Sequence, residues 1–255
     1  MCRPSLVVCL LVLLGVEIAL PQASVEKNPP FKSSDYPRSE FLVTQSTHEI
    51  GNVKVRIIHA KRRKQSETPP SFCRAWVEIR EGATLIRRIY YGDFEPVGYS
   101  YGVFVPAKQP SSDYFVFVKE GDYDGHLGLV DASGHLTDTL GGTFFVAEGR
   151  FLVSQYSSDE AGLAVFDFKA HKLTLKTNDI TYPYQWYRDA AGYFFTESEW
   201  SDNSGQAHEK PGVAYRLDLR RGGIVKVEMS ASKLHSAAAV KDDFDPRKSE
   251  DCTSR

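Results

Sequence analysis

An internal repeat is the feature that most restricts what this chain can fold into. Residues 115–140 and 151–177 each contain an apolar stretch, a polar turn, a second apolar stretch that ends in aspartate, a short turn and a third stretch. A further copy spans 193–229 and a weaker one spans 53–89, and another strand-like segment precedes the later copies. Repetition of one supersecondary unit is typical of arrays whose neighbouring units bury one another. The sequence therefore predicts units of four antiparallel strands.

The strands of one unit differ in their apolar pattern. The second and third strands, such as 151–156 and 162–167, are nearly continuous apolar runs, as expected where both faces of a sheet are covered. The fourth strand, such as 172–177, alternates between apolar and polar residues, which places it at a solvated edge. A sheet that is covered on both faces needs similar sheets on either side, and stacked blades supply that arrangement.

These features resemble a β-propeller over residues 40–229, in architecture only. No Trp-Asp dipeptide closes the units, and the glycine pairs at 141–142 and 222–223 lack the rest of a kelch pattern. The resemblance implies an all-β fold, a propeller-like array of about four four-stranded antiparallel blades around a common axis. A β-sandwich or β-barrel that contains the same hairpins is the alternative.

The N-terminus has the composition of an export signal. Residues 5–20 form a short apolar run after Arg3, and small residues lie near position 23, although Glu17 and Pro21 weaken the pattern. An uncleaved anchor is the alternative, but this run is short for a membrane span. We predict a secreted or periplasmic protein with a signal peptide at 1–23, a polar linker at 24–39, a β-repeat domain at 40–229 and a mobile charged tail at 230–255.

Cysteine and histidine usage restricts the chemistry. Cleavage at residue 23 leaves Cys73 and Cys252, for which an oxidising compartment predicts one disulfide, with two free thiols as the alternative. No histidine pair has metal-ligand spacing and no glycine-rich phosphate loop occurs, so we expect no metal and no cofactor. A net charge of −2 gives no case for a nucleic-acid partner.

Acidic residues recur at equivalent places near the ends of the third strands: Glu78, Asp131, Asp167 and Asp218. Four recurrent carboxylates invite a catalytic interpretation. However, an aspartate at a strand end accepts hydrogen bonds from backbone amides two residues further on, which explains the spacing without a substrate. We interpret these residues as structural turn acids.

An aromatic segment at 182–200 supplies the candidates for ligand binding. Tyrosine and tryptophan can stack on sugar rings or anchor a protein partner, which favours Tyr184, Trp186 and Trp200, with packing between blades as the alternative. Glu197 and Glu199 share one face of a strand about 7 Å apart. A carboxylate pair that close could suit glycoside hydrolysis.

A basic run, Lys61-Arg62-Arg63-Lys64, lies in a loop of the first unit. It could contact an anionic surface, or it could be a solvated loop. We expect an exported, non-catalytic β-repeat protein that binds a protein or glycan ligand through loops at one end of the scaffold. The alternative is an exported carbohydrate-active hydrolase that uses a carboxylate pair.

Overall fold

The computed structural model describes residues 28–63, 73–94, 102–120, 125–156, 162–178, 183–200 and 207–243. These residues form four antiparallel sheets, and in each sheet the first four strands are paired in the order in which they follow along the chain. The prediction of an all-β fold with four-stranded antiparallel units is therefore confirmed. The predicted signal peptide at 1–23 lies outside the described residues and stays a prediction.

The strand bounds follow the repeat. The first sheet consists of β1 (Phe41–Ile50), β2 (Val53–Arg62), β3 (Cys73–Glu81) and β4 (Thr84–Phe94). The second sheet consists of β5 (Gly102–Phe104), β6 (Tyr114–Glu120), β7 (Gly125–Asp131) and β8 (Leu136–Leu140). The third sheet consists of β9 (Thr143–Ala147), β10 (Phe151–Tyr156), β11 (Gly162–Asp167) and β12 (Lys172–Thr177). The fourth sheet consists of β13 (Pro183–Asp189), β14 (Gly192–Trp200), β15 (Ala207–Asp218) and β16 (Gly223–Glu228), with the short β17 (Ala238–Ala239) as a fifth strand.

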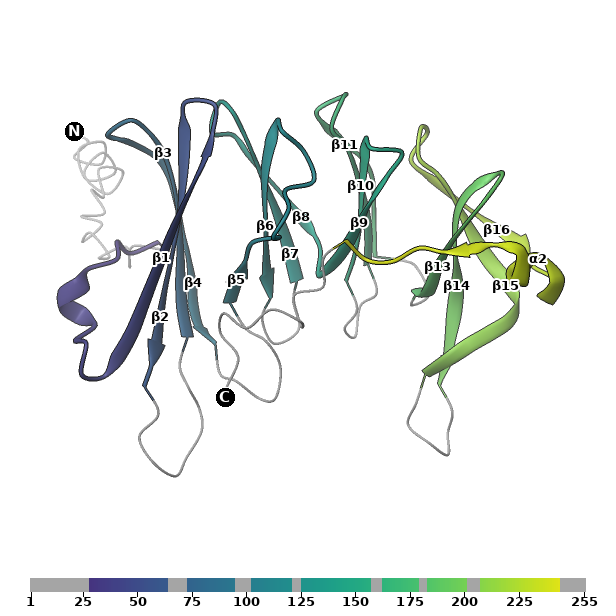
Figure 1. Ribbon diagram of the computed structural model, residues 1–255, viewed down its shortest axis with the longest axis horizontal. Helices are drawn as coiled ribbons and strands as arrows, with labels where there is room; N and C mark the ends of the chain where they lie inside the picture. Colours follow the sequence, from purple (N-terminus) through teal and green to yellow (C-terminus); the bar gives the residue numbers. More distant parts are fainter. Residues whose placement is uncertain are drawn as a thin grey trace, which may run out of the picture.

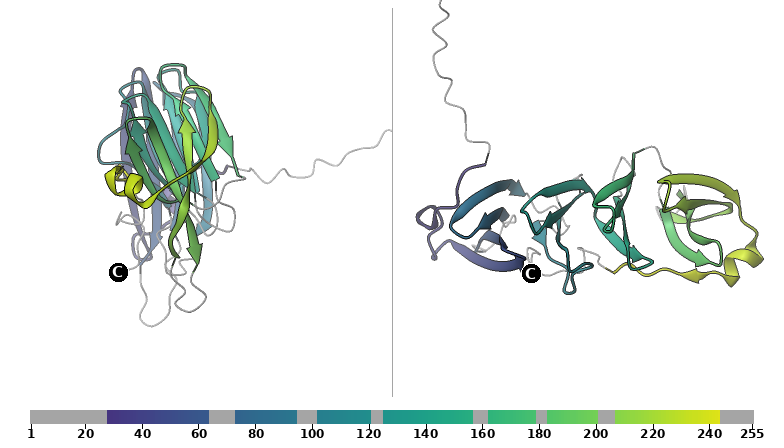
Figure 2. Two further views of the ribbon diagram at one scale, coloured as in Figure 1. Left: turned by 90° about the vertical axis from the view of Figure 1, so that its right-hand side faces the viewer. Right: turned by 90° about the horizontal axis from the view of Figure 1, so that it is seen from above.

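The four sheets stack face to face in one row (Figure 1), which is seen from above in Figure 2. The first and fourth sheets lie at opposite ends of this row, and no sheet closes into a barrel. The expected arrangement around a common axis is therefore wrong. The units are stacked as blades are, but the row stays open.

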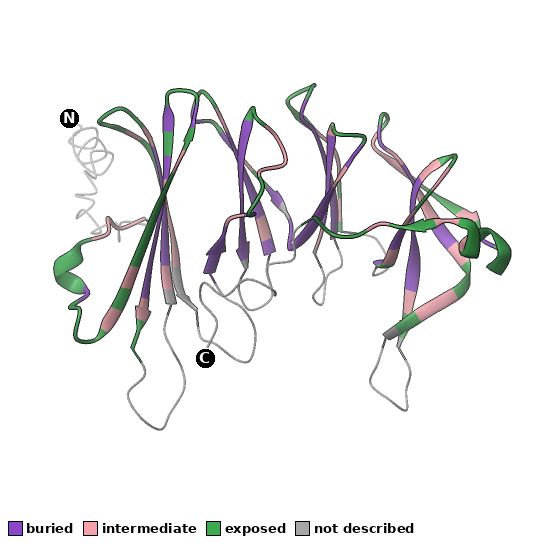
Figure 3. Ribbon diagram, viewed as in Figure 1, coloured by how far each residue is buried: buried purple, intermediate pink, exposed green. Residues whose placement is uncertain are grey.

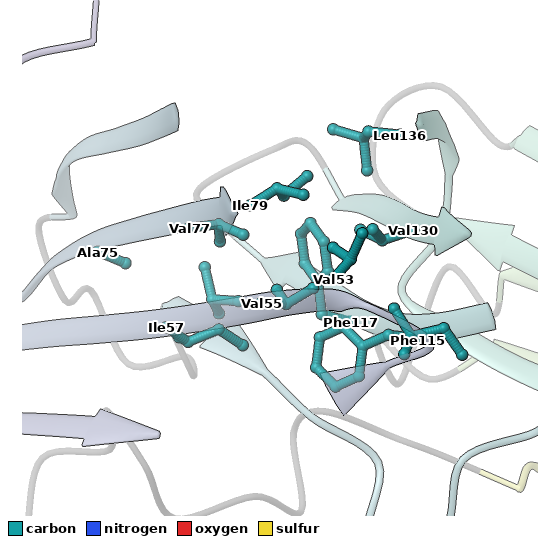
Figure 4. Packing of buried hydrophobic residues seen from close by; sticks show 12 residues of the cluster. Val53, Val55, Ile57, Ala75, Val77, Ile79, Phe115, Phe117, Val130 and Leu136 are labelled. Atoms are coloured by element: carbon teal, nitrogen blue, oxygen red, sulfur yellow. The ribbon is translucent and has the colours of Figure 1, made fainter. Parts of the chain in front are cut away.

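Side chains from facing sheets interdigitate to form three cores. Between the first and second sheets, Val55, Ile57 and Val77 pack against Phe115 and Phe117 (Figure 4). Equivalent clusters join the second sheet to the third and the third to the fourth. Every residue of β11 is buried because sheets cover both of its faces, as the burial colours in Figure 3 also show for the middle strands. This double burial explains the continuous apolar runs in the sequence.

Each end of the row is covered by a segment of the same chain. At the first sheet, residues 28–40 with the 3₁₀ helix η1 (Ser33–Asp35) pack Phe31 and Tyr36 against Trp76. At the fourth sheet, helix α2 (Ala231–Ser236) brings Leu234 to the apolar face that contains Phe194. Stacked repeats need such caps because the outermost apolar faces would otherwise meet water. Because both outer faces are capped, the row needs no fifth sheet to cover them.

The chain after α2 runs back along the first strands of the last two sheets (Figure 2). β17 pairs with β13, and the Val240 amide donates a hydrogen bond to the Trp186 carbonyl at 2.8 Å. Further on, Asp243 accepts a hydrogen bond from the Val146 amide of β9 at 2.7 Å and donates its own amide to the Phe144 carbonyl at 2.9 Å. These contacts satisfy edge groups of β13 and β9 that would otherwise be open to other chains.

One glycine permits the close approach of the third and fourth sheets. Gly222, in the turn between β15 and β16, has φ +68, and a Cβ at this position would lie 1.7 Å from the Thr174 carbonyl oxygen of β12. That oxygen belongs to the backbone, so relief of the clash requires the two sheets to separate.

We therefore expect Gly222→Ala to lower the free energy of unfolding by about 3 kcal/mol, through overpacking and an unfavourable left-handed backbone. Gly223→Ala is the matched control, because the nearest atom to its added Cβ lies at 4.0 Å. Urea unfolding followed by circular dichroism measures both variants. Equal stability of the two variants would contradict the close contact between these sheets.

Candidate functional site

The outer face of the first sheet, the face turned away from the second sheet, carries an aromatic cluster. Tyr36 lies 5.4 Å from Trp76 and 5.1 Å from Phe41, measured between ring centroids, and Phe31 stacks on Tyr36 at 5.5 Å. The Trp76 indole N–H donates a hydrogen bond to the Pro29 carbonyl at 3.0 Å. Residues 28–39 of the predicted polar linker are thus attached to the sheet by these rings.

A cavity of about 470 Å³, the first-sheet pocket, opens where residues 31–38 meet β1. Phe31, Tyr36 and Phe41 supply apolar lining, and Arg38 and Arg63 supply positive charge. The Arg63 Nε–H donates a hydrogen bond to the Arg38 carbonyl at 2.9 Å, which holds the two residues together. Among the described residues, no carboxylate forms an ion pair with either guanidinium. The pocket therefore combines aromatic surface with positive charge that is not neutralised within this part of the chain.

Further cations lie on the same face of the sheet. Arg56, Arg80 and Arg88 surround Glu78 at 3.4, 3.4 and 3.0 Å, and only 4% of the Glu78 side chain is exposed. Burial alone would raise the pKa of Glu78, but the hydrogen bond from Arg88 and the charges of Arg80 and Arg88 outweigh it and lower that pKa. Three guanidinium groups thus share one buried carboxylate on this face.

The basic run predicted to contact anions is divided by the structure. Lys61 and Arg62 end β2, and Arg63 follows directly, whereas Lys64 lies outside the described residues. Of the three described residues of this run, Arg63 alone lines the first-sheet pocket. Its partner Arg38 was not predicted, since it lies in a polar, proline-bearing stretch without periodicity. The sequence feature that could have indicated this site is the group of aromatic residues at 31, 36 and 41.

The aromatic segment does not form one binding surface. Trp186 is 3% exposed and packs against Phe145 and Phe195, and its indole N–H donates to Gln155, so its prediction as a ligand contact is wrong. Tyr184 is 45% exposed and separated from Trp186 by a shift of register in β13. Trp200 ends β14, and its side chain lies outside the described part.

Glu197 and Glu199 each face a different cation of β15. Glu197 is buried and pairs with Lys210 at 3.2 Å, while the exposed Glu199 lies 3.8 Å from His208. The strand pairing shifts between Thr196 and Ser198. Neither carboxylate lines the first-sheet pocket. Each carboxylate is thus engaged by its own cation of β15.

Three of the four recurrent acids close turns. Asp131 accepts hydrogen bonds from the amides of Ser133 and His135 at 2.9 and 3.0 Å. Asp167 does the same for Lys169 and Ala170, and Asp218 for Arg220 and Arg221.

Glu78 differs from these acids, because it lies within β3 and binds arginine side chains, so its assignment as a turn acid is wrong. In the first sheet, the equivalent turn lies between β3 and β4. It begins at Glu81 and contains Gly82, which has a φ of +55. Asp189, which was not predicted, closes the turn after β13 by accepting the Ala191 amide and also binds Arg216.

A second cavity, of about 480 Å³, lies among turns of the first three sheets. Asp113, Asp131 and His171 line it, and His171 has a φ of +53. The Tyr114 hydroxyl and His171 Nδ1 are 2.6 Å apart. The polar groups here form hydrogen bonds with one another and with nearby backbone amides. We therefore interpret them as residues that hold the turns together.

Metal and membrane features were also sought in the described ranges. In them no cluster of three or more His, Cys, Asp or Glu side chains could hold a metal ion. No helix in that part of the chain has the length and apolar character needed to cross a bilayer. The predicted disulfide stays a prediction, because Cys252 and the Cys73 side chain are outside the described part.

A scan against protein-family models and a search of curated proteins found no match for this sequence.

The two glutamates of β14 make a matched pair for a test. Because the Glu197 side chain is 11% exposed and accepts a charge-assisted contact from Lys210, we expect Glu197→Gln to lower the free energy of unfolding by about 1 kcal/mol, since the amide keeps an acceptor but loses the charge. Glu199→Gln should change it by less than about 0.5 kcal/mol, because exposed pairs contribute little. Thermal and urea unfolding measure both, and the reverse order of effects would contradict these positions.

Acid sensitivity provides a second test. The bidentate hydrogen bond from Arg150 lowers the pKa of Asp167 to about 2, from an ordinary 3.8. A lowered pKa in the folded state means that the carboxylate stabilises the protein above about pH 4, and that this contribution is lost as the pH falls towards 2. Asp167→Asn should therefore be less stable at neutral pH and show a smaller further loss between pH 4 and 2. Melting temperatures measured across this range would refute the role of the ion pair if both proteins gave the same profile.

Proposed function

We propose that this chain is an exported, non-catalytic binding protein, and that the first-sheet pocket contacts an acidic segment of a protein partner. One observation carries the proposal: Arg38 and Arg63 line the same cavity of about 470 Å³ as the aromatic residues. Neither arginine has a carboxylate partner among the described residues. Arginine and aromatic side chains are the residues most often responsible for binding energy at protein interfaces.

Several features favour binding over hydrolysis. The buried acids Glu78, Asp167 and Glu197 are each held by arginine or lysine side chains, and the exposed Glu199 lies alone beside His208. A binding surface at the end of a rigid row needs no movement of the sheets to meet a partner. Charge on its rim would also speed encounter with an acidic partner.

The test measures binding of fluorescein-labelled poly-L-glutamate by fluorescence anisotropy. Arg38→Glu combined with Arg63→Glu should weaken this binding at least tenfold, and the binding should weaken as salt is raised. The matched control is Arg220→Glu with Arg221→Glu, an identical charge change in an exposed turn of the fourth sheet. Circular dichroism confirms that both double variants are folded.

Equal loss in the two double variants would show that only overall charge matters and would overturn the proposed site. Binding of a sulfated polysaccharide at this pocket, without binding of the acidic polypeptide, would replace the protein partner with a glycan. Turnover of a chromogenic glycoside that is abolished by Glu197→Gln or Glu199→Gln would overturn the non-catalytic function.

A further inference from the structure

The first strand of the first sheet is an open sheet edge. β1 pairs with β2 along its whole length, and no described residue pairs with its other side. Its residues from Thr44 to Thr47 are exposed, and 47% of Leu42 is exposed (Figure 3, where β1 is mostly green). In an antiparallel strand, every second residue directs its N–H and C=O to one edge. β1 therefore presents a row of backbone donors and acceptors to its surroundings.

The equivalent edges of the third and fourth sheets are closed by the chain itself. β17 adds to β13, and Asp243 occupies hydrogen-bonding positions on β9. β5 is only three residues long and offers little edge. β1, with ten residues, is the long first strand whose edge the described chain leaves open.

β1 also lacks the residues that normally protect an edge strand. Proteins discourage pairing at an edge with charged side chains, lysine above all, or with proline. The strands at the opposite edges of the first, third and fourth sheets carry such cations: Arg87 in β4, Lys172 in β12 and Lys226 in β16. The sequence of β1, FLVTQSTHEI, contains no lysine, arginine or proline, and its one carboxylate, Glu49, lies near the end of the strand and pairs with Lys54. This edge is therefore chemically suited to pairing.

The open edge and the first-sheet pocket are continuous. Phe41, Val43 and Gln45 of β1 line the pocket, and so do Arg38 and Arg63. Successive side chains of a strand point to opposite faces, so a segment paired with β1 would direct every second side chain towards the outer face and the pocket. Carboxylates at those positions would meet the arginines, and apolar side chains at the intervening positions would point to the opposite face of the sheet.

We infer that β1 binds its partner by strand addition: an extended segment with alternating acidic and apolar residues becomes a fifth strand of the first sheet. In this mode the main-chain hydrogen bonds supply affinity and the pocket selects alternate side chains. The inference rests on the proposed function and specifies how the acidic partner is held. A second copy of the chain is disfavoured as the occupant, because edge-to-edge pairing would bring two arginine-rich faces together.

The experiment compares four synthetic peptides by fluorescence anisotropy against the wild-type protein and the two double arginine variants. The first peptide alternates glutamate and valine over seven residues. The second has the same composition with the glutamates in one block. The third and fourth are the alternating sequence N-methylated at every second residue, one in each register. N-methylation removes a backbone donor and blocks strand pairing without a change of charge.

Strand addition predicts that the alternating peptide binds at least tenfold more tightly than the block peptide. It also predicts that N-methylation abolishes binding in one register and is tolerated in the other, where the methyl groups point away from β1. Hydrogen exchange measured by mass spectrometry should show new protection in residues 41–50 when the alternating peptide is bound.

The outcomes separate the two proposals. If all peptides bind equally and Arg38→Glu with Arg63→Glu weakens them all, the acidic-partner function stands and strand addition is refuted. If no peptide binds, or if the arginine substitutions have no effect, the proposed function itself fails. Protection of residues 41–50 without peptide, in a protein that sediments as a dimer, would identify a second copy as the occupant and overturn the inferred partner.

Discussion

The burial of both faces of each sheet is the constraint on which the rest of this structure depends. The third sheet illustrates it: Phe166 packs towards the second sheet, and its neighbour Val165 packs towards the fourth. Adjacent residues in a strand point to opposite faces, so a sheet of this composition is stable only between two others. At each end of the stack, one sheet face has no neighbouring sheet and must be covered in another way.

Residues 28–40 cover one outer face and α2 covers the other, and the two covered ends differ in chemistry. At the fourth sheet, α2 and Met229 cover an apolar patch around Phe194. At the first sheet, the aromatic cluster covers one half of the face, and arginines around Glu78 occupy the other. A charged half-face is unsuited to stacking of a further sheet. The same chemistry that stops the row therefore leaves a cationic surface beside an open strand edge.

Periodicity was sufficient to predict the sheets and insufficient to predict the site. The runs at 151–156 and 162–167 identified adjacent buried strands because double burial leaves a direct signature in the sequence. Closure into a ring has no such signature, since it depends on the angle between sheets. Glu78 was misassigned because its place in the repeat resembled that of Asp131. The turn of the first sheet is shorter, so the residue that corresponds to Asp131 is Glu81. Trp186 was a plausible ligand contact by residue type alone, and only the neighbouring sheet determines that it is buried.

The open row imposes no closure condition on the number of units. In a ring, duplication of one blade changes the angle that every other blade must adopt. Here a duplicated unit inserted between the second and third sheets would need only to match its two immediate neighbours, because the caps belong to the chain termini and would be carried along unchanged. Proteins of this architecture can therefore differ in length by whole units during evolution while both terminal surfaces are retained.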